Sequence, residues 1–448
     1  MKPVKQRPGQ PLRTGTHTSG RQLIIVAVAL VTALSLAACG SSGDGEAGTA
    51  DSPVTLNFVG PEDPATLEPV IKLFEKENPS IQVEYQPVPF NDLNSILETR
   101  LASEDSTLDV YTADQPRIPA LAAKGFLLDL TEELPEVEDK VLEGSLDASM
   151  YQDKLWALPI WSSTQLLYYN KELLSAGKVT PPAIAPADRL TWEQLVTDAT
   201  AAQDAGAQYG FTFDQVSRYY QLQPLPESMG GGSGLGGDDF LEPDLTNEQW
   251  VKAFTWYGEL FESGLSPRGV TPEQTPELFT TGKVAYFLGG PWWLGEFQGT
   301  EGLDFGVAPH PYFEGGTPAT PTDAWSWGIN PASEHPEEAL AFLKFVSLSE
   351  PGATASVESA PFPPANVEAF DSYLTRLESS GEGSLNGISD LVREELTKAA
   401  VHRPRSVGYI QFETIMNKAF EDIRNGAEAG AALDQASTDF TEQASRLQ

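Results

Sequence analysis

The sequence predicts an α/β fold, because apolar residues recur alternately at strand spacing and at helix spacing over residues 54–111. Val54, Leu56 and Phe58 alternate with polar residues, which is typical of a β-strand with one face more deeply buried. The run from Leu67 to Phe74 then has apolar residues at helical spacing. A succession of strand, helix, strand, helix and strand predicts a parallel sheet covered by helices.

The boundaries of these elements also follow from particular residues. Gly60-Pro61 ends the first strand, and the helix after it has Asp63 as its candidate N-cap and Pro64 at its first position. Asn78-Pro79 ends this helix. The later patterns predict a strand at 81–85, a helix at 93–101 and a strand at 108–111.

Three acidic residues come directly after predicted strands. Glu62 and Asp63 follow the first strand, and Asp114 follows the third. In parallel α/β sheets, ligands bind at the carboxyl ends of the strands. We expect one of Glu62 and Asp63 to cap the helix and the other to touch a ligand. Asp114 is a further ligand candidate, with helix capping as the alternative.

The pattern of charged, apolar and small residues in the first 53 positions predicts an export signal followed by a tether. Residues 1–38 contain a basic region without Asp or Glu, an uncharged run from Leu23 to Leu36, and then small residues before Cys39. Cys39 is the single cysteine of the chain, so no disulfide is expected. Residues 39–53 have no large apolar residue and predict a flexible tether. The folded part is therefore expected at residues 54–448.

Composition and motifs exclude several functional classes. The formal net charge of −36 argues against nucleic acid as a partner. The sequence has no H-E-x-x-H, G-x-S-x-G or P-loop motif, so we predict no metal site and no cofactor. The glycine-rich segment Gly230–Gly237 contains a G-x-G-x-x-G pattern, but no apolar strand leads into it. It predicts a surface or cleft-edge loop, not a dinucleotide site.

Several motifs resemble those of one known family and occur in the same order. Leu36–Cys39 resembles a bacterial lipobox, in which the cysteine carries lipid. The other motifs are Lys154–Trp161, Leu166–Leu174, Thr191–Leu195, Phe279–Tyr286, Gly290–Trp292, Trp325–Asn330, His335–Phe345, and Arg403-Pro404 ahead of Gly408-Tyr409. Together they resemble the family 1 extracellular solute-binding proteins, the sugar receptors of ABC importers related to the maltose-binding protein.

The resemblance implies the type II periplasmic-binding-protein fold. In this fold two α/β lobes enclose a ligand cleft, and the chain crosses between the lobes more than once. By this resemblance residues 54–162 plus 320–348 form the N-terminal lobe, and residues 166–317 plus 352–448 form the C-terminal lobe.

Tryptophans are the first group of candidate ligand residues, because flat aromatic rings cover the apolar face of a sugar. Trp292 matches the position at which the family stacks the sugar, and Trp293 is its neighbour. Trp161 lies at the first crossing. Trp325 and Trp327 alternate on a predicted strand, so we expect one to face ligand, with Trp325 favoured, and the other to face the core.

Two candidates near the C-terminus come from the Arg-Pro motif. The guanidinium of Arg403 would donate hydrogen bonds to sugar oxygens, or else form a salt bridge between the lobes. Tyr409 would contact ligand or pack in the core.

The expected function is therefore sugar capture outside the cell and delivery to a membrane permease. The ligand is expected to be an oligosaccharide, the protein a monomer without enzymatic activity, and its anchor a lipid on Cys39 at the outer face of the cytoplasmic membrane. Two alternatives remain: a secreted glycoside hydrolase or lyase, which needs two carboxylates beside aromatic rings, and the same fold binding glycerol phosphate.

Overall fold

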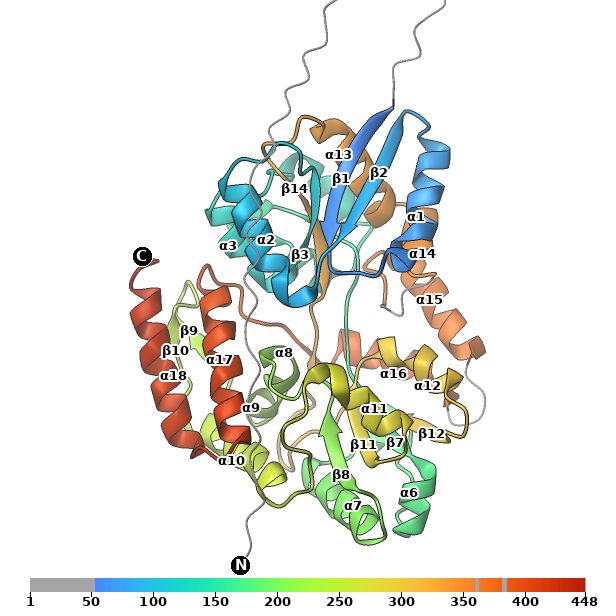
Figure 1. Cartoon of the computed structure of the whole chain (residues 1–448), viewed down its shortest axis with the longest axis vertical. Coiled ribbons are helices and arrows are strands. Elements are labelled where there is room, and N and C mark those ends of the chain that lie inside the picture. The colour runs from blue at the N-terminus through green and yellow to red at the C-terminus, as the bar shows by residue number, and fades with distance from the viewer. Residues whose placement is uncertain (1–52, 359–361, 381–384, 448) are drawn as a thin grey trace, which may run out of the picture. The chain divides into compact units, whose positions relative to one another are not determined.

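The computed structural model describes residues 53–358, 362–380 and 385–447. Two separate sheets organise these residues (Figure 1). The strand order is β2-β1-β3-β14-β6 in one sheet and β12-β7-β11-β8 in the other. The leader predicted at residues 1–38 and the tether predicted at residues 39–53, apart from Pro53, lie outside the described residues.

The first sheet is the predicted parallel series, extended by two later strands. β1 (Val54–Gly60) pairs in parallel with β2 (Ile81–Pro87) and β3 (Val110–Asp114). β14 (Trp325–Ile329) pairs antiparallel with β3 and with β6 (Leu158–Pro159). β14 thus returns to a sheet built by residues much earlier in the chain.

The helix after β1 begins where the sequence predicts. The carboxylate of Asp63 accepts a hydrogen bond from the main-chain N–H of Ala65 (2.8 Å), and Pro64 is the first residue of α1 (Pro64–Glu77). Other helices beside the first sheet are α2 (Phe90–Ala102), α3 (Ile118–Ala123), α13 (Pro336–Leu348) and α14 (Glu350–Ser356). Both α13 and α14 pack against α1. Ala355 and Val357 lie in the apolar core between these helices and the first sheet, which is called the first core below.

The second sheet mixes parallel and antiparallel pairs. β7 (Leu166–Asn170) pairs antiparallel with β11 (Val284–Gly289) and with β12 (Phe305–Ala308). β8 (Tyr209–Phe213) pairs in parallel with β11. The helices near this sheet are α6 (Lys171–Ala176), α7 (Trp192–Asp204), α11 (Thr275–Thr280), α12 (Leu294–Gly299), α15 (Val367–Ser380) and α16 (Ile388–Thr397).

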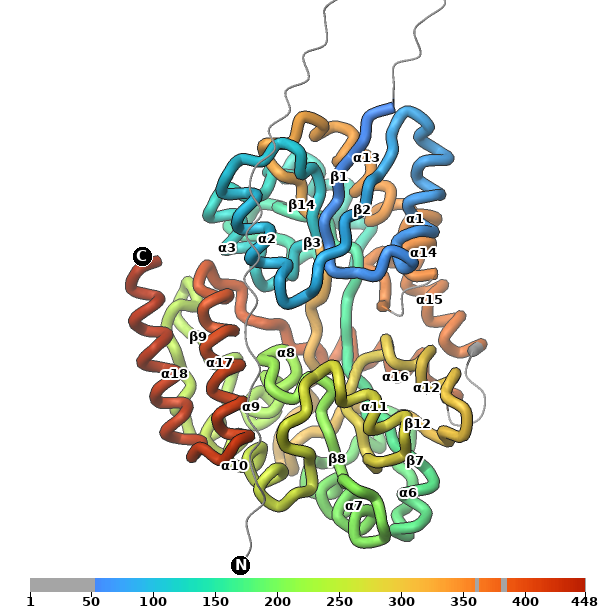
Figure 2. Tube along the Cα trace, in the orientation of Figure 1, coloured from blue at the N-terminus to red at the C-terminus, as the bar shows by residue number. Residues whose placement is uncertain are grey.

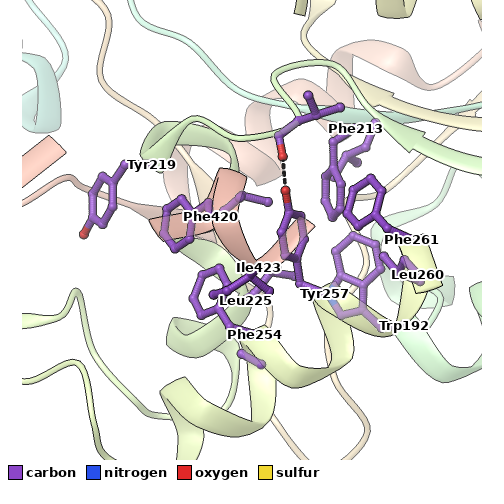
Figure 3. Close-up of a cluster of buried hydrophobic side chains, with 14 of the residues drawn as sticks. Trp192, Phe213, Tyr219, Leu225, Phe254, Tyr257, Leu260, Phe261, Phe420 and Ile423 are labelled. Carbon is purple, nitrogen blue, oxygen red and sulfur yellow. Dashed lines mark hydrogen bonds between the residues drawn. The ribbon is translucent and has the colours of Figure 1, made fainter. Parts of the chain in front are cut away.

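A helical layer close to the C-terminus packs with the second sheet and its helices to form one apolar core, which is called the second core below. α17 (Tyr409–Arg424) packs against α18 (Ala429–Ala444) and α10 (Glu248–Glu262), as the trace in Figure 2 shows. Figure 3 shows part of the apolar cluster among these helices and β8. Within it the Tyr257 hydroxyl donates to the main-chain oxygen of Val216, so the ring brings its polar atom into the core with a partner.

Short elements connect these layers. They are α4 (Leu134–Val137), α5 (Glu143–Ala148), β4 (Met150–Tyr151), β5 (Lys154–Leu155), α8 (Tyr219–Leu222), α9 (Pro224–Ser228), β9 (Leu235–Gly236), β10 (Glu242–Pro243), β13 (Thr320–Pro321) and β15 (Ala400–Val401). Within the described ranges, no helix is both long and apolar enough to cross a bilayer.

Substitution of Trp327 tests the packing of the first core. Its ring is fully buried, with ring centroids 4.4 Å from Phe58 and 5.6 Å from Phe342. Trp327→Ala removes these contacts and leaves a cavity, so we expect it to lower the free energy of unfolding by about 3–5 kcal/mol.

Urea unfolding followed by circular dichroism measures this loss. Phe240→Ala is the control, because Phe240 is 39% exposed and its truncation is expected to change the free energy by no more than about 0.5 kcal/mol. Equal effects of the two substitutions would contradict the packing described here.

Candidate ligand-binding site

Asp323 joins three segments that lie near one another: the connection from β6 to β7, the connection from β13 to β14, and the loop from β15 to α17. Its main-chain oxygen accepts a hydrogen bond from the hydroxyl of Ser163 (2.6 Å). Its carboxylate accepts from the main-chain N–H of Arg403 (2.7 Å) and lies 2.6 Å from Nδ1 of His402. The φ angle of Asp323 is 75°, in the left-handed region. This bend aims both the carbonyl and the carboxylate at neighbouring segments.

The pKa values of Asp323 and His402 respond to this contact in opposite directions. Burial works to raise the pKa of Asp323, but the hydrogen bond and charge of His402 and the charge of Arg403 outweigh it and lower the pKa. Burial works to lower the pKa of His402, but the hydrogen bond and charge of Asp323 raise it above its ordinary value of 6.5. The contact is therefore an ion pair at mildly acidic pH.

A second buried cluster brings together three of the sequence candidates. Asp114, at the end of β3, accepts a forked pair of hydrogen bonds from Arg403, 2.7 Å from Nη2 to Oδ1 and 3.1 Å from Nη1 to Oδ2. The Nε of Arg117 lies 3.4 Å from Asp114 Oδ2, and Arg117 also pairs with Glu413 of α17. Tyr409 donates to Glu413 (3.1 Å). Two cations and two carboxylates thus balance each other.

This cluster links the first sheet to the second core. Asp114 and Arg117 belong to the chain around β3, whereas Tyr409 and Glu413 belong to α17. The exposed fractions of the Asp114 and Arg403 side chains are 7% and 6%. Arg403 therefore forms the salt bridge that the sequence left open as an alternative. Contact between Arg403 and a ligand stays a prediction.

A pocket of about 220 Å³ adjoins the cluster. Asp114 and Arg117 line it on one side, and Ile410 and Gln411 of α17 line it on the other. Pockets for drug-sized ligands have volumes of roughly 300–1,000 Å³. The volume of this pocket lies below that range.

The two tryptophans after β11 share one hydrogen-bond acceptor. The indole N–H groups of Trp292 and Trp293 both donate to Oδ2 of Asp214, at 3.2 Å and 2.9 Å. Both rings are half-buried. Asp214 is not among the candidates predicted from the sequence, although it comes directly after β8 and its position at the end of a strand was a usable signal.

Trp161 and Trp292 both contact Phe362, which the sequence analysis also missed. Trp161 stacks on Phe362 with ring centroids 5.4 Å apart, and Trp292 lies 5.8 Å from the same ring at a tilt of 38°. Trp161 has no exposed surface, and its N–H donates to the hydroxyl of Ser356 (3.1 Å). In this arrangement Trp161 supports Phe362 from the protein side.

Trp325 and Trp327 divide as the alternation predicts. Trp327 is fully buried, whereas Trp325 is half-buried and meets the partly exposed ring of Phe90 edge-on at 5.8 Å. The register of β14 on β3 places Trp325 directly opposite Asp114. A ring and a carboxylate thus stand side by side at this end of the sheet.

Glu62 and Asp63 also separate in role. Asp63 is exposed and caps α1. Glu62 is buried and accepts hydrogen bonds from the Tyr85 hydroxyl (3.1 Å) and the Thr112 hydroxyl (3.4 Å). Burial raises the pKa of Glu62 to about 7, against the lowering effect of these hydrogen bonds. Its Oε1 is buried without a hydrogen-bond partner among the described residues.

The Asp323–His402 contact predicts how stability changes with pH. The contribution of Asp323 is present above its ordinary pKa of 3.8 and is lost as pH falls through its lowered value. The contribution of His402 is present below 6.5 and is lost as pH rises through its raised pKa. His402→Gln should therefore reduce the fall in melting temperature between about pH 6 and about pH 8.

Thermal unfolding at several pH values measures this change, with His335→Gln as the matched histidine control at the start of α13. An unaltered pH profile in His402→Gln would contradict the contribution assigned to the ion pair.

Comparisons with known proteins agree with this architecture. The chain is 23% identical to the ABC substrate-binding protein Lmo0181 from Listeria monocytogenes, solved in complex with cycloalternan, with a TM-score of 0.76 over 87% of this chain and 99% of that one. Maltose-bound MalE3 of T. maritima gives a TM-score of 0.74 at 20% identity, over 88% of this chain and all of that one. The predicted type II periplasmic-binding-protein fold is confirmed.

Sequence relatives cover most of the chain as well. The galactooligosaccharide-binding protein of Bacillus subtilis (strain 168) is 25% identical over 359 residues, 78% of this chain and 81% of that protein. The maltodextrin-binding protein MdxE of the same strain is 25% identical over 342 residues, 75% of this chain and 79% of that protein. The family described as bacterial extracellular solute-binding protein matches residues 59–353, more than half of the chain, which therefore belongs to this family.

Proposed function

We propose that this protein is the substrate-binding component of an ABC importer and that its ligand is an oligosaccharide. The observation that carries the proposal is the placement of half-buried aromatic rings beside carboxylates at the ends of strands in both sheets. In the first sheet, Trp325 lies opposite Asp114 at the end of β3. In the second sheet, Trp292 after β11 donates a hydrogen bond to Asp214 at the end of β8. Rings for the apolar face of a sugar and acceptors for its hydroxyls are the groups such a site needs.

The relatives support the same ligand class. Two of them are named for the galactooligosaccharides and the maltodextrins that they bind. One of the structural neighbours was solved in complex with cycloalternan, and another with maltose bound.

The contacts described above suggest how each candidate serves the site. Trp292 and Trp325 offer ring faces, and Glu62, Asp114 and Arg403 offer hydrogen bonds. Three further residues support these groups. Trp161 stacks on Phe362, which contacts Trp292. Tyr409 accepts a hydrogen bond from Arg403, and Trp293 shares Asp214 with Trp292. Asp63 caps α1, so Glu62 is the one of this pair that we assign to the ligand.

Capture works by a shift between conformations. A ligand that touches both β3 and α17 gains its full set of contacts only when these elements are close, so its binding favours the closed arrangement. The permease then receives the ligand unchanged. No bond of the sugar is broken in this cycle.

A sugar titration tests the proposal. Maltotriose, a galactotriose, mannitol and glycerol phosphate are added in turn while tryptophan fluorescence is recorded, and incubated samples are assayed for new reducing ends. We expect saturable binding of an oligosaccharide without new reducing ends. A response to glycerol phosphate alone, or release of new ends, would contradict the proposal.

Trp292→Ala provides the corresponding mutational test. Removing a central ring is expected to weaken oligosaccharide binding at least about tenfold, which is about 1.4 kcal/mol. Trp156→Ala is the control, because Trp156 is also half-buried but contacts Tyr151 and Lys154 away from these residues. Similar affinities for Trp292→Ala and the parent protein would exclude Trp292 as a stacking surface.

We also propose that Cys39 carries the lipid that keeps the monomeric receptor at the outer face of the cytoplasmic membrane. The sequence Leu36–Cys39 and the uncharged run before it support this proposal. Cys39→Ala is expected to move the protein from the membrane fraction to the medium and to abolish labelling by a radioactive fatty acid. Retention of Cys39→Ala in washed membranes would contradict it.

A further inference from the structure

Asp214 connects two tryptophans to the second sheet through a single oxygen. It follows β8 directly and is 3% exposed. Its Oδ2 lies 2.9 Å from the indole nitrogen of Trp293 and 3.2 Å from that of Trp292. An indole N–H donates only along the plane of its ring, so each bond fixes the direction of a whole ring.

The carboxylate itself is held in place by its own main chain. The N–H of Asp214 donates to the main-chain oxygen of Leu288 (2.8 Å) in β11, the strand that leads to the tryptophans. Its main-chain oxygen accepts from the hydroxyl of Thr275 (2.8 Å) at the start of α11. Asp214 is therefore fixed relative to both strands before it orients either ring.

Burial raises the pKa of Asp214 to about 7, although the hydrogen bonds from Trp293 and Trp292 work to lower it. Among the described residues Asp214 makes no ion pair. The nearby cation Arg218 pairs with Glu273 and lies over the ring of Phe90. An ionised carboxylate in a buried position requires hydrogen-bond donors, and the two indoles supply them. The two tryptophans and the carboxylate thus stabilise each other.

The two rings are constrained differently. Trp293 stacks on Phe297 with an interplanar angle of 15° and packs against the adjoining core. Trp292 folds back over the main chain of Gly290, where an added Cβ would come within 1.9 Å of its ring. Glycine is thus required under Trp292, and the bond to Asp214 sets the direction in which the ring extends from that point.

We propose that Asp214 is a positioning residue that holds Trp292 in its ligand-stacking orientation before the ligand arrives. This inference rests on the proposed function, because it assigns Trp292 a ligand. Asp214 does not touch the ligand itself. By fixing the ring in the free protein, it removes the cost of ordering that side chain during binding, which is the usual origin of gains from preorganisation.

Near-UV circular dichroism tests the ligand-free part of this proposal. The difference between the parent protein and Trp292→Phe isolates the signal of a fixed Trp292. The same difference is then measured between Asp214→Ala and the double variant Asp214→Ala/Trp292→Phe. We expect the signal to be lost when Asp214 is absent. An equal difference spectrum in both backgrounds would overturn the proposal, whatever the protein binds.

Affinity for maltotriose and for a galactotriose tests the ligand-dependent part in the same four proteins. Asp214→Ala and Trp292→Phe are each expected to weaken binding about fivefold or more, and the double variant is expected to lose little beyond the weaker single variant. Independent, multiplying losses would overturn the proposal. If the parent binds neither sugar, the proposed ligand fails, while the dichroism still decides the role of Asp214.

Two controls separate positioning from general loss of structure. Asp198→Ala removes a half-buried carboxylate on α7 whose partner is Gln194, and it should leave both the Trp292 signal and the affinity unchanged. Asp214→Asn keeps the shape and one acceptor oxygen, so it is used if Asp214→Ala does not fold. It should retain only part of the Trp292 signal, and a signal fully equal to that of the parent in every Asp214 variant that folds would count against the carboxylate.

Discussion

The arrangement of the two sheets depends on the bonds made by Asp323. This residue accepts a left-handed backbone, at a cost of about 1–2 kcal/mol for a residue other than glycine. In return it meets Ser163, His402 and Arg403 within 2.7 Å. These bonds hold three segments of the chain together at one point. The same point supports Arg403, whose side chain reaches Asp114.

Buried charge organises the rest of the candidate site. Arg117 and Arg403 face Asp114 and Glu413 in one cluster, and Asp214 faces two indole N–H groups in another. Breaking one partner of a buried pair leaves the other charge uncompensated, at a cost of about 3–5 kcal/mol. These clusters therefore resist any rearrangement that would separate the partners and leave one charge buried alone. Trp292 and Trp293, which bond to Asp214, and Trp325, which lies opposite Asp114, are placed by these clusters.

The sequence predicted those features that depend on local pattern. Strand and helix alternation located the first sheet, Asp63 and Pro64 marked the start of α1, and strand alternation separated Trp325 from Trp327. Contacts between distant segments were out of reach of such patterns. Arg117 and Glu413 lie 296 residues apart, and the sequence around either residue does not predict its contact with the other. Phe362 was missed for the same reason, because its importance comes from what folds against it, whereas Asp214 could have been selected from its place at the end of β8.

The forked bond between Arg403 and Asp114 has a consequence for the geometry between β3 and the loop from β15 to α17. Its two parallel hydrogen bonds align the guanidinium with the carboxylate, so the contact specifies an orientation as well as a distance. A lysine at position 403 would supply a point charge without this directional preference. Arginine at this position therefore limits twisting of one segment against the other.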